Sequence, residues 1–249
     1  MVHFRPKGKN EKCPDIKING SQINQVDKAK FLGVIIDCKL TWADHTKHVI
    51  QKISKGIGII IKARKYFNQE TLLNLYNTLI LPFMSYCIHV WGRAADIYLD
   101  KIHILQKKIV RIISGVPPRT HSQPLFDELN IMKIKQLYKY FICVFMYKLF
   151  HEQLPPLFSM FKRISYTHSL TTSSLSTRQN DSFITPAHKT ARTENTIKIT
   201  GSQLWNILIT EVDIYCKIST YKTKIKNILL FCTNSKLYKF LFIKPYKLT

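Results

Sequence analysis

The acidic side chains of this 249-residue chain offer few groupings that could carry out catalysis. Its 15 Asp and Glu residues are scattered singly, apart from Asp127 and Glu128. Adjacent residues point in different directions on a helix, so this pair indicates a solvated loop or helix start rather than a two-carboxylate centre. The chain contains no phosphate-binding glycine loop, no dinucleotide-binding motif and no adjacent aspartates. We therefore predict no catalytic residue.

Histidine and cysteine do not form a recognisable metal site either. His45 and His48 are three residues apart and would share a helical face, but a metal ion needs a further ligand that no nearby residue suggests. The cysteines show no Cys-x-x-Cys pair; they are Cys13, Cys38, Cys87, Cys143, Cys216 and Cys232. We predict no metal, free thiols and a reducing intracellular location, cytoplasmic or nuclear.

Positive charge is the chemical feature that the chain does offer. Lys and Arg number 38, which gives a formal net charge of +23 and favours phosphate-rich polymers or anionic surfaces as partners. Part of this excess could instead reflect A/T-rich codons, which also encode Ile, Asn, Tyr and Phe. The longest apolar stretch, Leu79 to Trp91, is too short to span a bilayer. Binding to a membrane surface stays an alternative.

Two segments carry basic residues without a single acid. Six Lys or Arg lie between Thr46 and Gln69, and five lie between Lys101 and Phe126. Soluble helices normally mix both signs, so these segments favour a track for nucleic-acid phosphates over a merely solvated face. The candidate nucleic-acid-binding residues are Lys52, Lys55, Lys62, Arg64, Lys65, Lys101, Lys107, Lys108 and Arg111.

Hydrophobic periodicity predicts helices that would position these basic residues. A long helix follows Asp44, which could cap it. Further helices are predicted over residues 69–81, 95–115 and 134–151, with Pro82 and Gly115 as stop signals. The apolar stripe predicted for the first helix consists of Val49, Ile53, Ile57, Ile60 and Ile61.

The two ends of the chain show other patterns. Asn19-Gly20 between apolar runs predicts a hairpin, and the run from Phe31 to Asp37 predicts a buried strand. After residue 157, the Ser/Thr-rich residues 165–177 predict a linker. The run Ile197–Ile199 then precedes a predicted turn at Gly201 and a helix around Trp205. The predicted fold is mainly α, with short N-terminal β hairpins or strands, a helical bundle and a smaller mixed C-terminal region.

Several blocks of residues occur in one order between about residue 2 and residue 230. They are Phe31-Leu32-Gly33-Val34, Asp37, Leu40-Thr41-Trp42, His45, Lys52, Ser54-Lys55, Leu75-Tyr76, Leu81-Pro82, Ser85-Tyr86, Val90-Trp91-Gly92, Leu105-Gln106-Lys107-Lys108, Arg111-Ile112-Ile113, Gly115, His121, Pro124-Leu125-Phe126, Leu129, Thr177-Arg178, Gly201 and Leu204-Trp205-Asn206. This order resembles the segment that follows the catalytic palm in reverse transcriptases of jockey-like non-LTR retrotransposons. Cys87 departs from that family, which commonly has glycine after the tyrosine.

The resemblance implies that successive segments of the chain correspond to different parts of a polymerase. Residues 1–40 would be the β-rich end of a polymerase palm, with Phe31, Leu32 and Gly33 near the region that grips the primer end. Residues 41–157 would be a thumb-like helical bundle, and residues 158–249 a basic C-terminal region. The implied partners are an RNA/DNA template–primer duplex and the fingers and palm of the parent polymerase.

The resemblance also implies that chemistry takes place elsewhere in the polymerase. The family's Y-x-D-D strand, whose aspartates hold two divalent metal ions such as Mg²⁺, precedes these blocks. We therefore expect no cofactor here, no catalytic role for Asp37 and no activity of this chain alone. Two alternatives stay open: a freestanding, domesticated nucleic-acid-binding module, and a decayed reading frame whose product cannot fold. The coding sequence immediately upstream would distinguish them from a polymerase fragment.

Overall fold

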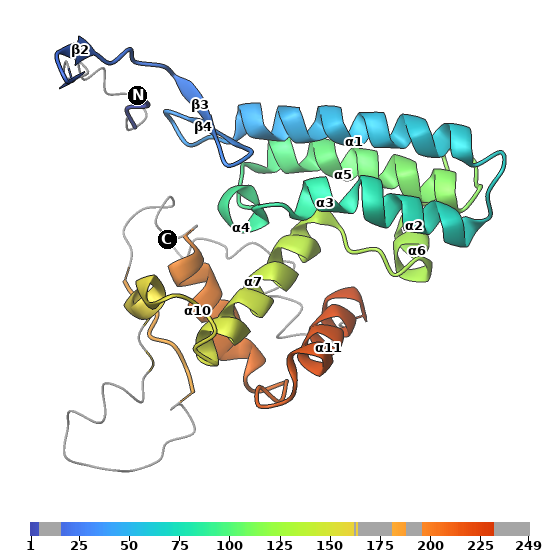
Figure 1. Cartoon of the computed structure of the whole chain (residues 1–249). Helices are drawn as coiled ribbons and strands as arrows, with labels where there is room; N and C mark the ends of the chain where they lie inside the picture. Colours follow the sequence, from blue (N-terminus) through green and yellow to red (C-terminus); the bar gives the residue numbers. More distant parts are fainter. Residues whose placement is uncertain (5–15, 162, 164–180, 188–195, 232–249) are drawn as a thin grey trace, which may run out of the picture. The chain divides into compact units, whose positions relative to one another are not determined.

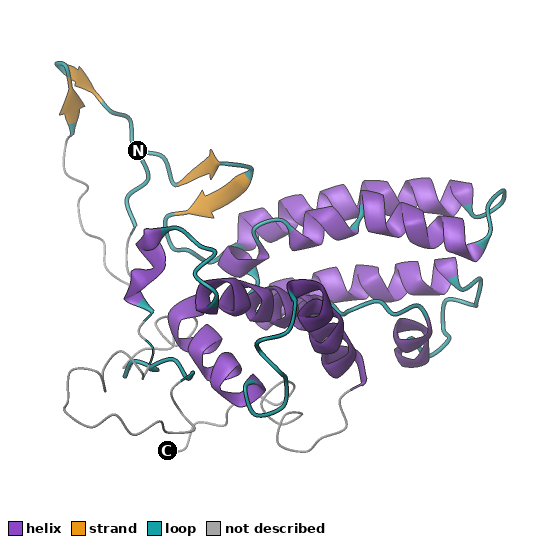
Figure 2. Cartoon of the chain, turned by 60° about the horizontal axis from the view of Figure 1, so that its bottom comes forward, coloured by secondary structure: helices purple, strands orange, loops and turns teal. Residues whose placement is uncertain are grey.

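The structure is a computed structural model that describes residues 1–4, 16–161, 163, 181–187 and 196–231. In this part the chain is mainly helical, and its strands form two N-terminal hairpins (Figure 2). The chain divides into two compact units, a first unit of Met1–Leu129 and a second unit of Asn130–Thr249. The predicted fold class is confirmed. The division at residues 40 and 157 stays a prediction, and the linker expected at residues 165–177 lies outside the described residues.

The first hairpin agrees with the turn signal in the sequence. Strand β1 (Lys17–Ile18) pairs antiparallel with β2 (Ser21–Gln22). Between them, Asn19 and Gly20 have φ values of 49° and 80°. Two successive positive φ values are typical of a type I′ turn, for which Asn-Gly is the preferred sequence. The predicted hairpin is confirmed.

The second hairpin corrects the prediction of one buried strand from Phe31 to Asp37. Strand β3 (Lys28–Phe31) pairs with β4 (Val34–Asp37), and the turn between them consists of Leu32 and Gly33, with φ values of 44° and 81°. Val34 is buried, whereas Phe31 and Leu32 are 64% and 74% exposed. The prediction was wrong because Gly33 lets an otherwise continuous apolar run reverse its direction.

The remaining secondary-structure elements described in the first unit are helices. The chain runs along α1, returns through α2 and α3, and goes out again along α5, which packs beside α1 (Figure 1). Pro82 lies in the first turn of α3, where a missing N–H breaks no helical hydrogen bond, and Gly115 follows α5 with a φ of 68°. The helices are α1 (Ala43–Ala63), α2 (Gln69–Leu79), α3 (Leu81–Ser85), α4 (Ile88–Trp91), α5 (Asp96–Ile113) and α6 (Gln123–Glu128).

Asp37, rather than Asp44, organises the start of α1. The Asp37 carboxylate accepts hydrogen bonds from the Thr41 amide (2.9 Å), the Thr41 hydroxyl (3.0 Å) and the Trp42 amide (3.0 Å). Burial alone would raise the pKa of Asp37, but these bonds hold it below its ordinary value. Asp44 lies in the first turn of α1 and pairs with the Lys28 ammonium at 3.1 Å, so the prediction that it caps the helix was wrong.

The core of the first unit is built from the apolar stripes of α1, α2 and α5. Gly56 lets α1 approach the α2–α3 junction closely, because a Cβ atom at this position would lie 3.0 Å from Ile80 Cγ1. Ile61 is 39% exposed, so its assignment to the buried stripe was wrong. The almost fully buried side chains include Ile53, Ile60, Tyr76, Ile80, Met84, Ile88, Trp91, Ile102 and Phe126.

The second unit contains α7 (Ile134–Phe150), a short 3₁₀ helix (Pro156–Met160), α10 (Ile197–Leu208) and α11 (Ile218–Phe231). Both α10 and α11 pack against α7. The turn predicted at Gly201 was wrong, because this residue belongs to α10. Gly201 is buried there, and a Cβ atom on it would lie 2.8 Å from Met146 Sδ. Its glycine therefore reflects close helix packing, not a turn.

The Trp205-Asn206 motif has a structural role in the second unit. The indole N–H of Trp205 donates to the backbone carbonyl of Asp181 at 2.9 Å. The Asn206 side-chain amide donates to the Phe183 carbonyl and accepts from the Phe183 amide, both at 2.9 Å. Together these bonds hold the described residues 181–187 against α10.

Candidate nucleic-acid interface

Helix α1 presents its basic residues on the side opposite to its core. Its buried residues include Val49, Ile53 and Ile57. Lys52, Lys55 and Lys62 are exposed. Their spacing of three and seven residues brings them close to one line along the helix. We call these three residues the α1 lysine stripe.

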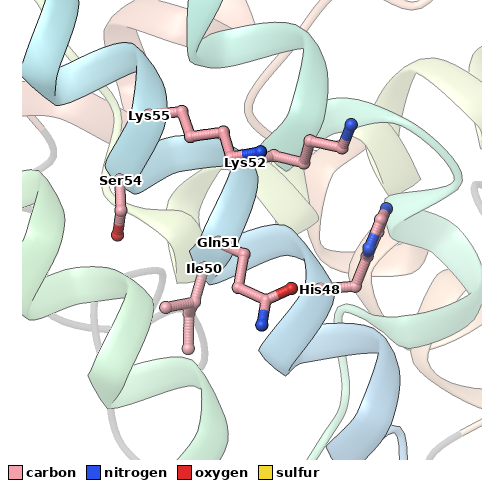
Figure 3. Close-up of a pocket in the computed structure, with 6 residues that line it drawn as sticks. All are labelled: His48, Ile50, Gln51, Lys52, Ser54 and Lys55. Atoms are coloured by element: carbon pink, nitrogen blue, oxygen red, sulfur yellow. The ribbon is translucent and has the colours of Figure 1, made fainter.

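The positive field of the stripe extends to the second hairpin. A depression on the exposed side of α1 is lined by His48, Ile50, Gln51, Lys52, Ser54 and Lys55 (Figure 3). Partial burial lowers the pKa of His48, and the charges of Lys52 and of Lys30 on β3 lower it further. Three groups from two elements thus face the same region, which disfavours another proton and favours an anion.

The charges of the α1 lysine stripe are not neutralised by neighbouring acids. Within the described ranges, none of the three lysines forms a salt bridge. No acidic residue occurs in the sequence between Asp44 and Glu70. Arg64 and Lys65, which follow α1 directly, are exposed as well. This part of the predicted site is therefore a connected, accessible set of cations.

The basic residues predicted on α5 have unequal surroundings. Lys101 and Lys108 are exposed, whereas Lys107 is half-buried. The Arg111 guanidinium donates through Nε to the backbone carbonyl of Thr120 at 2.7 Å. Arg111 therefore anchors the loop that follows α5, a role that its basic character did not indicate. A phosphate contact by any α5 residue stays a prediction.

The tip of the second hairpin is held by Tyr86. The Tyr86 hydroxyl donates to the backbone carbonyl of Leu32 at 2.6 Å. A Cβ atom on Gly33 would lie 3.2 Å from Tyr86 Cε1, so the glycine also lets the tyrosine ring approach. The exposed side chains of Phe31 and Leu32 are thus presented from a fixed backbone.

A chain of contacts connects this tyrosine back to the hairpin. The indole N–H of Trp91 donates to the Tyr86 carbonyl at 2.9 Å, and the Trp91 ring meets the His45 ring edge-on at 5.3 Å between centroids. His45 Nδ1 accepts from the Ile35 amide at 3.3 Å. We call this the Tyr86–Trp91–His45 network. Sequence reasoning missed it because His45 on α1 and Trp91 on α4 lie 46 residues apart, and periodicity reports only local contacts.

The buried histidine of this network makes the stability of the first unit depend on pH. Burial, and secondarily the charge of His48, lowers the pKa of His45 from 6.5 to about 4. Between pH 6.5 and about 4, His45 therefore binds a proton in the unfolded chain but not in the folded chain. Stability is fully present above about pH 6.5 and is lost as pH falls towards 4. We expect the free energy of unfolding to drop by about 2–3 kcal/mol over this window in urea titrations.

The control for this pH dependence is His48, which is only half-buried. The variant His48→Asn should keep most of the drop, whereas His45→Gln should flatten it while lowering stability overall. If the free energy of unfolding fell equally steeply with pH in the His45→Gln variant and in the unmodified chain, His45 would not be the source of the pH dependence.

Cys87 joins α3 to α4 in a left-handed conformation, with φ 49° and ψ 27°. This conformation costs a residue with a side chain roughly 1–2 kcal/mol, part of which glycine regains at the expense of greater freedom in the unfolded chain. We expect Cys87→Gly to raise the free energy of unfolding by about 0.5–1 kcal/mol in chemical denaturation. Cys87→Ala, which removes the thiol but keeps the strain, should not stabilise.

Other kinds of site are not found in the part of the chain that the structure describes. No group of three or more His, Cys, Asp or Glu residues is placed to hold a metal ion among these residues. None of the described helices is long and apolar enough to cross a membrane. Cys38, Cys87, Cys143 and Cys216 are free thiols, while Cys13 and Cys232 lie outside the described residues.

Comparisons with known proteins relate about half of the chain to one class of enzyme. The chain is 32% identical over 125 residues to the RNA-directed DNA polymerase from mobile element jockey of Drosophila funebris, and 31% identical over the same length to that of Drosophila melanogaster. It is 26% identical over 124 residues to the probable RNA-directed DNA polymerase from transposon X-element of Drosophila melanogaster. Each alignment covers 49% of this chain and 14% of the relative.

No protein-family model and no solved structure matches the chain significantly. The similarity to jockey-type RNA-directed DNA polymerases agrees with the resemblance carried by the ordered sequence blocks. The alignments extend over less of the chain than those blocks, which run from about residue 2 to residue 230.

Proposed function

We propose that the helices of the first unit act as the thumb of a retrotransposon reverse transcriptase and hold an RNA–DNA template–primer duplex by its backbone. The observation that carries this proposal is the un-neutralised α1 lysine stripe, in a chain of which half is similar to RNA-directed DNA polymerases. From Lys52 to Lys62 the stripe extends for about 15 Å along α1. A duplex of this length carries roughly nine phosphate charges, which is ample for several lysine contacts.

The tip of the second hairpin would contact the primer end in this arrangement. The exposed side chains of Phe31 and Leu32 can pack against sugars and base edges, and Gly33 permits the turn that presents them. The Tyr86–Trp91–His45 network supports this role because it ties the hairpin to α1 and α4. Tip and stripe would then meet the same duplex in a fixed register.

Nucleotide transfer would require residues that this sequence does not show. The 249 residues contain no Y-x-D-D strand, whose aspartates would hold the two divalent metal ions that activate the primer hydroxyl. The proposed role is therefore to bind and position, and the proposed protein partners are the fingers and palm of a polymerase. We expect no primer extension by the chain alone.

The test measures binding of the 249-residue chain to a labelled RNA–DNA duplex by fluorescence anisotropy at several salt concentrations. The logarithm of the affinity should fall linearly with the logarithm of the salt concentration, with a slope of about −2.7 to −4.5 for three to five phosphate contacts. Absent or salt-independent binding would contradict the proposal. Primer extension in the presence of Mg²⁺ and nucleotides would contradict the proposed lack of activity.

A freestanding nucleic-acid-binding module is the second candidate function. The buried core shared by α1, α2 and α5 favours it, because a unit with a core of its own can fold independently. Cooperative thermal unfolding of the chain would support both candidates and count against a product that cannot fold. Both candidates predict the same binding to the duplex. The coding sequence immediately upstream would distinguish a polymerase fragment from a freestanding module.

A further inference from the structure

The loop between α1 and α2 exposes two aromatic side chains beside two cations. Tyr66 is 81% exposed and Phe67 is 53% exposed. Arg64 and Lys65 precede them directly and are exposed as well. Large aromatic side chains normally bury most of their surface, so two adjacent exposed rings indicate a contact with another molecule. The α1 lysine stripe leads to this loop, since Lys62 lies two residues before Arg64.

Hydrogen bonds of the backbone and of the Asn68 side chain hold the loop to both helices. The amides of Tyr66 and Phe67 donate to the carbonyl of Ala63 at 2.9 and 3.1 Å. The side chain of Asn68 accepts from the Thr71 amide at 3.0 Å and so caps α2. The two rings are therefore presented from an ordered backbone, which reduces the entropy that binding would cost.

We propose that this loop binds single-stranded nucleic acid, with unpaired bases stacked on Tyr66 and Phe67 and the adjoining phosphates held by Arg64 and Lys65. Every base has a flat face that stacks on an aromatic ring, and each carries a phosphate next to it. A nucleotide therefore matches both features of the loop, whereas an apolar protein surface would match the rings and leave the cations unpaired. The inference deepens the proposed function: the template strand would reach the loop as it leaves the duplex held by α1.

The experiment compares two substrates, a blunt RNA–DNA duplex and the same duplex with a single-stranded template overhang, using the 249-residue chain. We expect the overhang to raise the affinity about tenfold, the effect of stacking one base on an aromatic side chain. The double variant Tyr66→Ala, Phe67→Ala should bind both substrates equally, with the affinity for the blunt duplex and the dependence on salt unchanged. Tyr66→Phe should retain the preference for the overhang, because stacking needs the ring and not the hydroxyl.

A matched control is Phe83→Ala, which removes another partly exposed aromatic ring, on α3. It should leave the preference for the overhang intact. Equal binding of blunt and overhang substrates by the unmodified chain would overturn this inference while leaving the proposed duplex binding in place; failure to bind either substrate would overturn both. Self-association of the chain that disappears in the double variant would also overturn it, because the rings would then contact a second copy.

Discussion

Replacing Trp91 with alanine should lower the free energy of unfolding of the first unit by about 4 kcal/mol. Trp91 is fully buried, so its removal leaves a large cavity between α4 and its neighbours. The substitution also removes the hydrogen bond to the Tyr86 carbonyl and the ring contact with His45. Since the total stability of a domain is often about 5–15 kcal/mol, this loss would remove a large part of the stability of the first unit. Urea titration followed by far-ultraviolet circular dichroism measures the change.

Two milder variants show how much of the loss of stability in Trp91→Ala comes from the Tyr86–Trp91–His45 network. Trp91→Phe keeps much of the volume and should cost less than half as much. Tyr86→Phe removes only the hydroxyl bond to the Leu32 carbonyl, so it should cost about 1 kcal/mol and leave the helices folded. It should also loosen the hairpin tip and so make cleavage there by proteases faster. Near-normal stability of the Trp91→Ala variant would contradict the burial of Trp91 in the core of the first unit.

Replacing all three residues of the α1 lysine stripe with alanine should weaken binding to an RNA–DNA duplex by about 100-fold or more at moderate salt. Each lysine that contacts a phosphate releases counterions, so the three substitutions should also make the salt slope shallower by roughly 2.7. All three side chains are exposed, and their removal should leave the thermal unfolding temperature nearly unchanged. Anisotropy titrations at several salt concentrations measure both effects.

A triple variant of the second unit controls for the loss of positive charge. Lys217, Lys222 and Lys224 are exposed, and replacing them with alanine removes the same number of positive charges. If binding depends on the α1 lysine stripe, this control should retain most of the affinity and of the salt slope. Equal losses for the two triple variants would show that the chain attracts nucleic acid only through its overall charge.

Local signals in the sequence predicted most of the secondary structure. Asn19-Gly20 specified its turn, and the period of apolar residues specified the helices, because both depend on residues close together in the chain. The errors at Leu32-Gly33 and at Gly201 share one cause. Glycine can stand in a strand, in a turn or in a close contact between helices, and only the tertiary structure decides which of these it makes.

The candidate site was predictable to a smaller degree. The exposure of Lys52, Lys55 and Lys62 follows from their position opposite an apolar stripe. The anchoring of Arg111 to Thr120 does not, because it depends on how the loop after α5 folds back. The network around Trp91 likewise joins residues distant in sequence, and no spacing rule reports such contacts. The exposed rings of Tyr66 and Phe67 carry no periodic signal either.

The bond from Tyr86 to the hairpin tip has a consequence for how the tip can diverge during evolution. The tyrosine hydroxyl contacts the carbonyl oxygen of Leu32, an atom that every amino acid possesses. Position 32 can therefore exchange its side chain without moving the tip, and asparagine would suit its positive φ better than leucine does. Gly33 has no such freedom, because an added methyl group would press on the tyrosine ring. The tip thus combines a turn residue that its surroundings restrict to glycine with a neighbouring side chain that can change without moving the turn.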